Sequence, residues 1–330
     1  MRRPLTAIAG LALATVTALA ATACSGNSTS STGGGEASGT TKIVLVAKAD
    51  ASDYWTAVKE GALQAGQDLG VTVEWVGPAT ETEPDKQLQQ LDSAINGKPA
   101  GIGFAPQDGA QAQAPTYLQK AQDAGIPVVA FDTPVADTDI PIATIASDNK
   151  QIGAMAAEKL SELIGGQGTV GIIAHGEVGT AADRRDGFID WMKANAPGVT
   201  LLPAQNGNSD QAESRTKAAG VLTANPDLAG FFGTDDDSVI AIAEEVQSKG
   251  STAVVIGVDA SPDEIRLVKE GKITGGITQN PGGIGYQAVK VLVDAANGTQ
   301  PAEKNIVSPA VWYTKDNLDS AEVVAVLGEQ

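Results

Sequence analysis

The chain is poor in the side chains that many hydrolases use for catalysis. Its 330 residues contain one histidine, His175, and one cysteine, Cys24. If Cys24 is modified, as argued below, no thiol is left for a disulfide bond, a thiol-based hydrolase or a zinc site of ordinary composition. A single histidine also argues against the usual imidazole-based hydrolases. We therefore expect neither an enzyme nor a metal site.

Basic residues are scarce as well, with 22 lysines and arginines against 40 aspartates and glutamates and a net charge of −18. This charge repels phosphate backbones and anionic lipid headgroups, so nucleic acid is a poor candidate partner. The glycine-rich segment at 165–168 comes before a predicted strand and not after one. It therefore predicts a turn rather than a dinucleotide-binding loop, and no cofactor is expected.

The N-terminal residues predict an export signal. Two arginines precede an apolar segment at 7–21, and small residues lead directly to Cys24. This arrangement resembles a bacterial lipoprotein signal, in which the cysteine is acylated and becomes the new N-terminus. Residues 25–41 are almost entirely small and polar, as in a flexible tether. We expect an extracytoplasmic protein, lipid-anchored to the outer face of the bacterial cytoplasmic membrane or periplasmic. The alternative is an ordinary secretory signal with an incidental cysteine.

From residue 42 onward, short β-branched runs alternate with longer amphipathic segments, and this alternation predicts parallel sheets covered by helices. The pattern runs twice, so we expect an α/β protein with two doubly wound parallel-sheet lobes. The first lobe has predicted strands at 42–47, 71–76, 101–105, 127–131 and 142–146, and helices at 54–69, 84–96 and 109–124. The second has strands at 169–174, 199–202, 229–232, 253–258 and 273–277, and helices at 150–164, 181–195, 210–223, 238–248 and 262–269.

Polar and aromatic residues follow the ends of these strands, where doubly wound sheets bind ligands. Asp132 and Asp259 can each accept hydrogen bonds from two adjacent hydroxyls, and Arg184 can donate in a fixed fork. An aromatic face of Tyr54 or Trp55 can pack against the C–H faces of a sugar ring. With hardly any titratable base nearby, this set predicts a neutral polyhydroxylated ligand. Glycosidase chemistry between the two aspartates remains possible, but nothing in the sequence selects it.

Several of these residues also have a purely structural interpretation. Trp55 has the spacing of a core residue. Asp148 precedes an apolar periodic run and is expected to cap the following helix. Asp236 and Asp237 are expected to complement a helix dipole. The run Asp235 to Asp237 is a weak metal candidate, because three consecutive carboxylates are expected to point in different directions.

Seven motifs occur in order along nearly the whole chain after the tether. They are DYWTAVKEGA at 53–62, GIPVVAFD at 125–132, ASDN at 146–149, RRDGF at 184–188, TANPD at 223–227, GVDAS at 257–261 and QNP at 279–281. Their order and spacing resemble the type 1 periplasmic binding proteins of bacterial sugar ABC importers, specifically the ribose- and allose-binding branch. The resemblance implies a monomeric solute-binding lipoprotein that captures a monosaccharide or small polyol by lobe closure. It also implies delivery to an ABC permease and its ATPase.

The resemblance further implies which residues contact the sugar. These are Tyr54, Trp55, Asp132, Arg184, Asp235, Asp259 and Gln279. The segment at 77–82, together with Lys48, resembles the branch that binds autoinducer-2 and rhamnose, so Lys48 is a further candidate. The alternative function is a binding subunit that reports a sugar or autoinducer-2 to a receptor without import.

The predicted domain organisation follows from the points where the chain passes between lobes. Two crossings are readable in the sequence, near 147–150 and 279–281, and the resemblance implies a third near 307–310, which makes a three-segment hinge. We expect a signal peptide at 1–23 and a linker at 24–41. The N-terminal lobe is then 42–147 plus 280–307, and the C-terminal lobe 148–279 plus 308–330.

Overall fold

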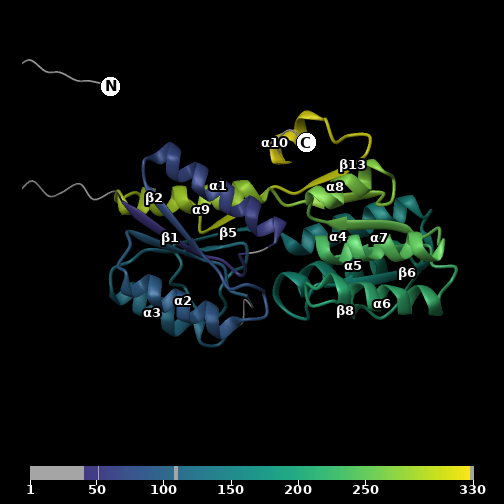
Figure 1. Ribbon diagram of the computed structural model, residues 1–330, viewed down its shortest axis with the longest axis horizontal. Coiled ribbons are helices and arrows are strands. Elements are labelled where there is room, and N and C mark those ends of the chain that lie inside the picture. The colour runs from purple at the N-terminus through teal and green to yellow at the C-terminus, as the bar shows by residue number, and fades with distance from the viewer. Residues whose placement is uncertain (1–40, 51, 108–110, 328–330) are drawn as a thin grey trace, which may run out of the picture. The chain divides into compact units, whose positions relative to one another are not determined.

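The computed structural model describes residues 41–50, 52–107 and 111–327 (Figure 1). Cys24, the predicted signal peptide and nearly all of the tether lie outside the described residues. Within the described part of the chain, none of the helices combines the length and apolar character needed to span a membrane.

The first sheet has six parallel strands in the order β12-β5-β4-β3-β1-β2. Its strands are β1 (Lys42–Val46), β2 (Thr72–Val76), β3 (Gly101–Phe104), β4 (Val128–Phe131), β5 (Ala143–Ser147) and β12 (Asn305–Ser308). One face packs against α1 (Asp53–Leu69) and α9 (Pro281–Ala296), and the other against α2 (Pro84–Asn96) and α3 (Ala114–Asp123) (Figure 1). The core therefore has two layers, as expected for strands that are buried on both faces.

The second sheet has the order β13-β11-β10-β9-β6-β7, with β8 also paired to β6. Its strands are β6 (Gln167–Ala174), β7 (Gly198–Leu201), β8 (Gln205–Asn206), β9 (Gly230–Gly233), β10 (Val254–Val258), β11 (Gly275–Thr278) and β13 (Val311–Thr314). The helices of one face are α4 (Asn149–Leu163) and α5 (Gly179–Asn195). Those of the other are α6 (Gln211–Ala224), α7 (Asp236–Lys249), α8 (Pro262–Lys269) and α10 (Ala321–Leu327). The two-lobed α/β fold predicted from the sequence is confirmed by these two sheets.

Most predicted elements agree with the structure to within a few residues. The third helix is the exception, because α3 begins at Ala114 and not at 109, a position outside the described residues. The pattern analysis did not predict β8, α9, β12, β13 or α10, and β13 is antiparallel to β11. Asp148 caps α4 as predicted, since its carboxylate accepts a hydrogen bond from the backbone N–H of Gln151 at 3.0 Å.

The chain passes between the two sheets three times. It leaves the first sheet after β5, returns to it between β11 and α9, and leaves again between β12 and β13. The assignment of every residue to one lobe or the other stays a prediction.

One pair of helices in each lobe packs backbone against backbone. In the first lobe, a Cβ atom added at Gly61 of α1 would overlap Gly282 O, and one added at Gly285 of α9 would overlap Val58 O. In the second lobe, α4 and α5 meet in the same way, because a Cβ at Gly153 or Gly187 would overlap a backbone carbonyl of the partner helix. These contacts require glycine, since no other residue lacks the Cβ atom.

Candidate functional site

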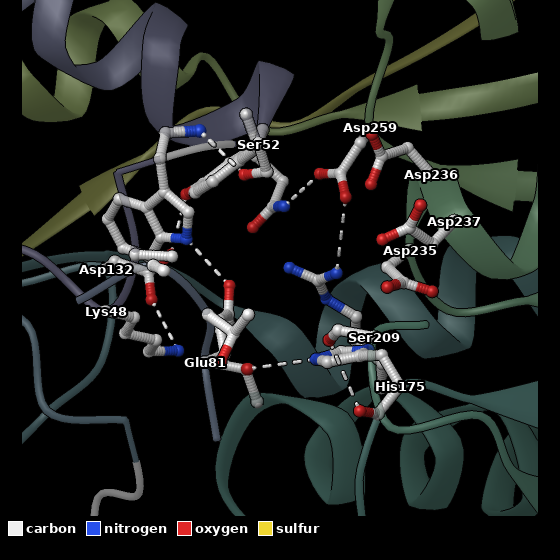
Figure 2. A pocket seen from close by; sticks show the side chains of 18 residues that line it. Lys48, Ser52, Glu81, Asp132, His175, Ser209, Asp235, Asp236, Asp237 and Asp259 are labelled. Atoms are coloured by element: carbon white, nitrogen blue, oxygen red, sulfur yellow. Dashed lines mark hydrogen bonds and ion pairs between the residues drawn. The ribbon is translucent and has the colours of Figure 1, made fainter. Parts of the chain in front are cut away.

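A cavity of about 220 Å³ lies at strand ends and helix starts of both lobes. All eight residues that the sequence analysis selected as ligand contacts line it. They are Lys48, Tyr54, Trp55, Asp132, Arg184, Asp235, Asp259 and Gln279. We call the residues Lys48, Tyr54, Trp55, Glu81 and Asp132 the N-lobe wall, and Arg184, Asp235, Asp236, Asp237 and Asp259 the C-lobe wall. Figure 2 shows the aspartates of the C-lobe wall opposite Lys48, Glu81 and Asp132.

The N-lobe wall is organised around Asp132, which directly follows β4. Its Oδ2 atom lies 2.8 Å from Lys48 Nζ and accepts a hydrogen bond from Thr133 Oγ1 at 2.8 Å. Its Oδ1 atom accepts from the Tyr54 hydroxyl at 2.6 Å. Burial alone would raise the pKa of Asp132, but the Lys48 charge and these hydrogen bonds hold the pKa below its usual value. Asp132 is therefore an ionised carboxylate with its partners already in place.

Trp55 belongs both to the lobe core and to the cavity wall. Its side chain is 1% exposed and packs edge-on against Phe131, with ring centroids 6.2 Å apart. Its indole N–H points to the cavity side and donates to Glu81 Oε1 at 2.7 Å. The structural interpretation of Trp55 is thus correct, and its position in the cavity lining is compatible with ligand contact as well.

Arg184 and Asp259 form the centre of the C-lobe wall. Arg184 donates from Nε to Asn149 Oδ1 at 2.8 Å and from Nη1 to Thr234 O at 2.6 Å. Its Nη1 lies 4.0 Å from Asp259 Oδ2. The side-chain amide of Gln279 donates to the other oxygen of Asp259. Burial raises the pKa of Asp259, and the Arg184 charge only partly opposes this.

Asp235 starts α7 and serves as its N-cap, because its Oδ1 accepts from the backbone N–H of Ser238 at 3.1 Å. Burial raises its pKa to about 7. Asp236 and Asp237 occupy the first turn of α7, as predicted. Burial and the neighbouring carboxylates raise the pKa of Asp237 to about 6 and that of Asp236 well above its usual value.

The expected orientation of these three aspartates was wrong. One carboxylate oxygen from each of Asp235, Asp236 and Asp237 lies within 4.8 Å of the others. The reason is that Asp235 precedes the helix in extended backbone while the next two residues are helical, which turns all three side chains toward the cavity. The three carboxyl groups therefore lie close enough for their charges to repel one another, which adds to burial in raising the pKa values of Asp235 and Asp236.

The cavity is also lined by residues that were not selected from the sequence as ligand contacts, among them His175 and Glu81. His175 follows β6, with Nδ1 2.7 Å from Thr234 Oγ1 and Nε2 3.3 Å from Thr180 Oγ1. Burial and the charge of Arg184 hold the pKa of His175 well below its usual value, so the imidazole is neutral. Its position after a strand was a usable signal. For Glu81, the sequence contains no comparable indication of a place in the site beyond its position in the segment at 77–82.

The chemistry of the cavity favours a ligand that donates hydrogen bonds. Among the described residues, six carboxyl groups and two cations line it, and both cations already lie beside a carboxylate. A phosphate or carboxylate on the ligand would meet repulsion from the C-lobe wall. Hydroxyl groups, in contrast, supply the donors that the aspartates lack.

Three comparisons agree with this geometry. The family model described as "Periplasmic binding protein domain" matches residues 43–300. The D-allose-binding periplasmic protein of Escherichia coli (strain K12) is 27% identical over 264 residues, which are 77% of this chain and 84% of that protein. A carbohydrate transporter solute binding protein from Agrobacterium radiobacter, crystallised with D-arabinose, has a TM-score of 0.82 and 27% identity, covering 88% of this chain and 99% of that one. An ABC transporter solute binding protein from Agrobacterium vitis, bound with alpha-D-tagatopyranose, has a TM-score of 0.80 and 30% identity, covering 86% and 98%.

Proposed function

The chain belongs to the periplasmic binding protein family, and on this basis we propose that it captures a monosaccharide or small polyol outside the cytoplasm and delivers it to an ABC permease and its ATPase. Its relatives include a D-allose-binding periplasmic protein and solute binding proteins of carbohydrate and ABC transporters. The observation that carries the proposal is the cavity lined from both lobes, in which carboxylate acceptors outnumber cations.

Binding acts through closure of the two lobes. We infer that the lobes are 42–147 plus 280–307 and 148–279 plus 308–330, joined by the three crossings. A ligand that contacts both walls stabilises the closed arrangement, because it has no such pair of contacts when the lobes are apart. Gln279 lies beside one crossing and contacts Asp259, so it links the hinge to the ligand.

Each candidate residue has a part in recognising the hydroxyl groups. Asp132 and Asp259 accept from hydroxyls at opposite ends of the ring, and Lys48 and Arg184 donate to ring or hydroxyl oxygens. Tyr54 and Trp55 contact the C–H surface of the sugar. An analogue without one of the hydroxyls leaves a buried carboxylate unpaired, and selectivity follows from that penalty.

Delivery to the permease requires the protein to stay near the membrane. Cys24 as an acylated N-terminus would provide the anchor, and residues 25–41 the tether. The protein then works as a monomer on the outer face of the cytoplasmic membrane. Mass spectrometry of the protein from membranes tests this, since acylation adds lipid mass to Cys24 and Cys24→Ala removes it.

Thermal-shift screening tests the ligand class. The panel comprises pentoses, hexoses, deoxyhexoses and polyols, with amino acids and sugar phosphates as controls. A sugar or polyol present at 100 times its Kd stabilises the folded protein by about 2.7 kcal/mol through mass action. If only phosphorylated or zwitterionic compounds raise the melting temperature, the proposed function is wrong.

A further inference from the structure

A buried carboxyl group lies behind the C-lobe wall and outside the cavity lining. Glu264, in the first turn of α8, is fully buried, and only one of its oxygens has a partner among the described residues. Burial raises its pKa, the charges of Asp259, Asp236 and Asp235 raise the pKa further, and Tyr313 hydrogen-bonds to its side chain. An ionised Glu264 would therefore meet only like charges in a low-dielectric interior.

The hydrogen bonds of Tyr313 indicate where the proton of Glu264 lies. The Tyr313 Oη atom is 2.7 Å from Glu264 Oε1 and 2.8 Å from the backbone oxygen of Asp259. A phenol has one hydrogen and can donate fully to only one of these acceptors. The carbonyl has no hydrogen to give, so the contact with Glu264 is satisfied when Glu264 is a neutral acid that donates to Tyr313. Burial, which raises the pKa of Glu264 well above its usual range, supports the same assignment.

Tyr313 in turn holds the main chain of Asp259. Asp259 has φ = +90°, a conformation that residues with a side chain rarely adopt and that persists only when its surroundings enforce it. Its N–H donates to Ile277 O at 2.9 Å, and its carbonyl accepts from Tyr313. The backbone is thus fixed from both sides, which directs the carboxylate toward Arg184 and Gln279.

The backbone of β11 packs directly against the side chains of Glu264 and Tyr313. Gly276 of β11 lies against them, since a Cβ at this position would overlap the Tyr313 hydroxyl and lie 2.8 Å from Glu264 Oε1. Such close packing leaves no room for a water molecule to replace the hydrogen bond between the two side chains.

We propose that Glu264 is a positioning residue for ligand binding: as a neutral acid it donates to Tyr313, which holds Asp259 in the conformation that meets the ligand. The inference rests on the proposed role of Asp259 in binding. It adds a polar network that the cavity lining does not include.

Binding measurements on three variants test the network. Isothermal titration uses the compound among D-allose, D-arabinose, D-tagatose and xylitol that raises the melting temperature most. Glu264→Gln keeps a donor and is expected to bind within about threefold of the wild type at pH 7, whereas Glu264→Ala and Tyr313→Phe bind about tenfold more weakly. Val323→Ala, in the same lobe core, is the control: it lowers the melting temperature and leaves Kd unchanged.

The pH profile of Kd distinguishes positioning from general destabilisation. Because burial raises the pKa of Glu264 above its usual range, the wild-type Kd is expected to rise with pH where Glu264 ionises, and the Kd of Glu264→Gln lacks this rise. Asp235, Asp236 and Asp237 titrate in both proteins, so the difference between the two profiles belongs to Glu264. Parallel profiles, or a Glu264→Gln variant as weak as Glu264→Ala, overturn the proposal.

A ligand-free measurement separates this inference from the proposed function. The infrared difference spectrum of wild type minus Glu264→Gln at pH 6, where an ordinary glutamate is ionised, is expected to contain the carbonyl stretch of a protonated carboxylic acid. A carboxylate band in its place refutes the neutral acid, whatever binds in the cavity. If none of the four compounds binds while the acid band is present, the choice of ligand class is wrong and Glu264 is still protonated.

Discussion

The two walls of the cavity place their buried carboxyl groups in opposite electrostatic environments. On the N-lobe wall, Asp132 has a lysine, a phenol and a hydroxyl as partners, and its pKa is lowered. On the C-lobe wall, Asp235 and Asp237 have raised pKa values, because burial and like charges dominate. Asp132 on the N-lobe wall is fully partnered without ligand, whereas the four carboxyl groups of the C-lobe wall share one cation, Arg184. This difference suggests that a ligand gains most of its hydrogen bonds from the C-lobe wall.

The largest effect on stability is expected when Asp132 is removed from the N-lobe wall. Asp132→Ala leaves Lys48 as a buried charge without its partner, so the free energy of unfolding should fall by about 3 to 5 kcal/mol in urea denaturation. The control is Lys48→Met combined with Asp132→Leu, which removes both charges and should recover most of the stability without sugar binding. Full stability of Asp132→Ala would contradict the buried pair.

A smaller effect is expected from pH, with opposite signs for the two walls. Asp235 and Asp237 hold protons in the folded protein up to about pH 7 and 6, so their contribution to stability is lost as pH rises from about 4 to 7. Asp132 has a lowered pKa, and its contribution is lost only as pH falls below about 4. We expect the ligand-free protein to be about 2 kcal/mol more stable at pH 5 than at pH 8 in urea denaturation. Stability that rises steadily to pH 8 would contradict the assignment.

A single neutralisation on the C-lobe wall should stabilise the protein. At pH 8, Asp237→Asn removes a charge that burial and its neighbours disfavour, and we expect the free energy of unfolding to rise by about 1 kcal/mol. Asp190→Asn, at an exposed position of α5, serves as the control and should change little. The gain should disappear at pH 5, where Asp237 is already largely protonated; an equal gain at both values would have another cause.

The smallest effect is expected from the conservative substitution Glu81→Gln. In Glu81→Gln the amide oxygen can still accept from Trp55 Nε1, so stability should change by less than about 0.5 kcal/mol. Glu81→Leu removes the acceptor and leaves a buried indole N–H unpaired, which costs about 1 to 3 kcal/mol. Equal losses in both variants would mean that the charge of Glu81, and not its hydrogen bond, matters.

Much of the fold and the site could be predicted because both depend on local patterns. Strand and helix periodicity located most elements, and strand ends identified Asp132 and Asp259 as neighbours of one cavity. The contact between Lys48 and Asp132 could not be derived from spacing, because it depends on the strand order of the sheet, in which β3 lies between β1 and β4. The cluster at Asp235 depends on one backbone conformation before α7, which the sequence does not specify. Glu264 and Tyr313 meet only because the C-terminal strand β13 returns antiparallel to β11, and that strand was not predicted.

The glycine contacts between helices have a mechanical consequence. Side chains between two helices can change rotamer and let the helices slide, but the backbones of α1 and α9 touch directly, as do those of α4 and α5. Each lobe is therefore expected to move as a rigid body whose helices do not slide past one another. Conformational change is then concentrated in the three segments that connect the lobes. A force applied anywhere on one lobe therefore moves its whole cavity wall.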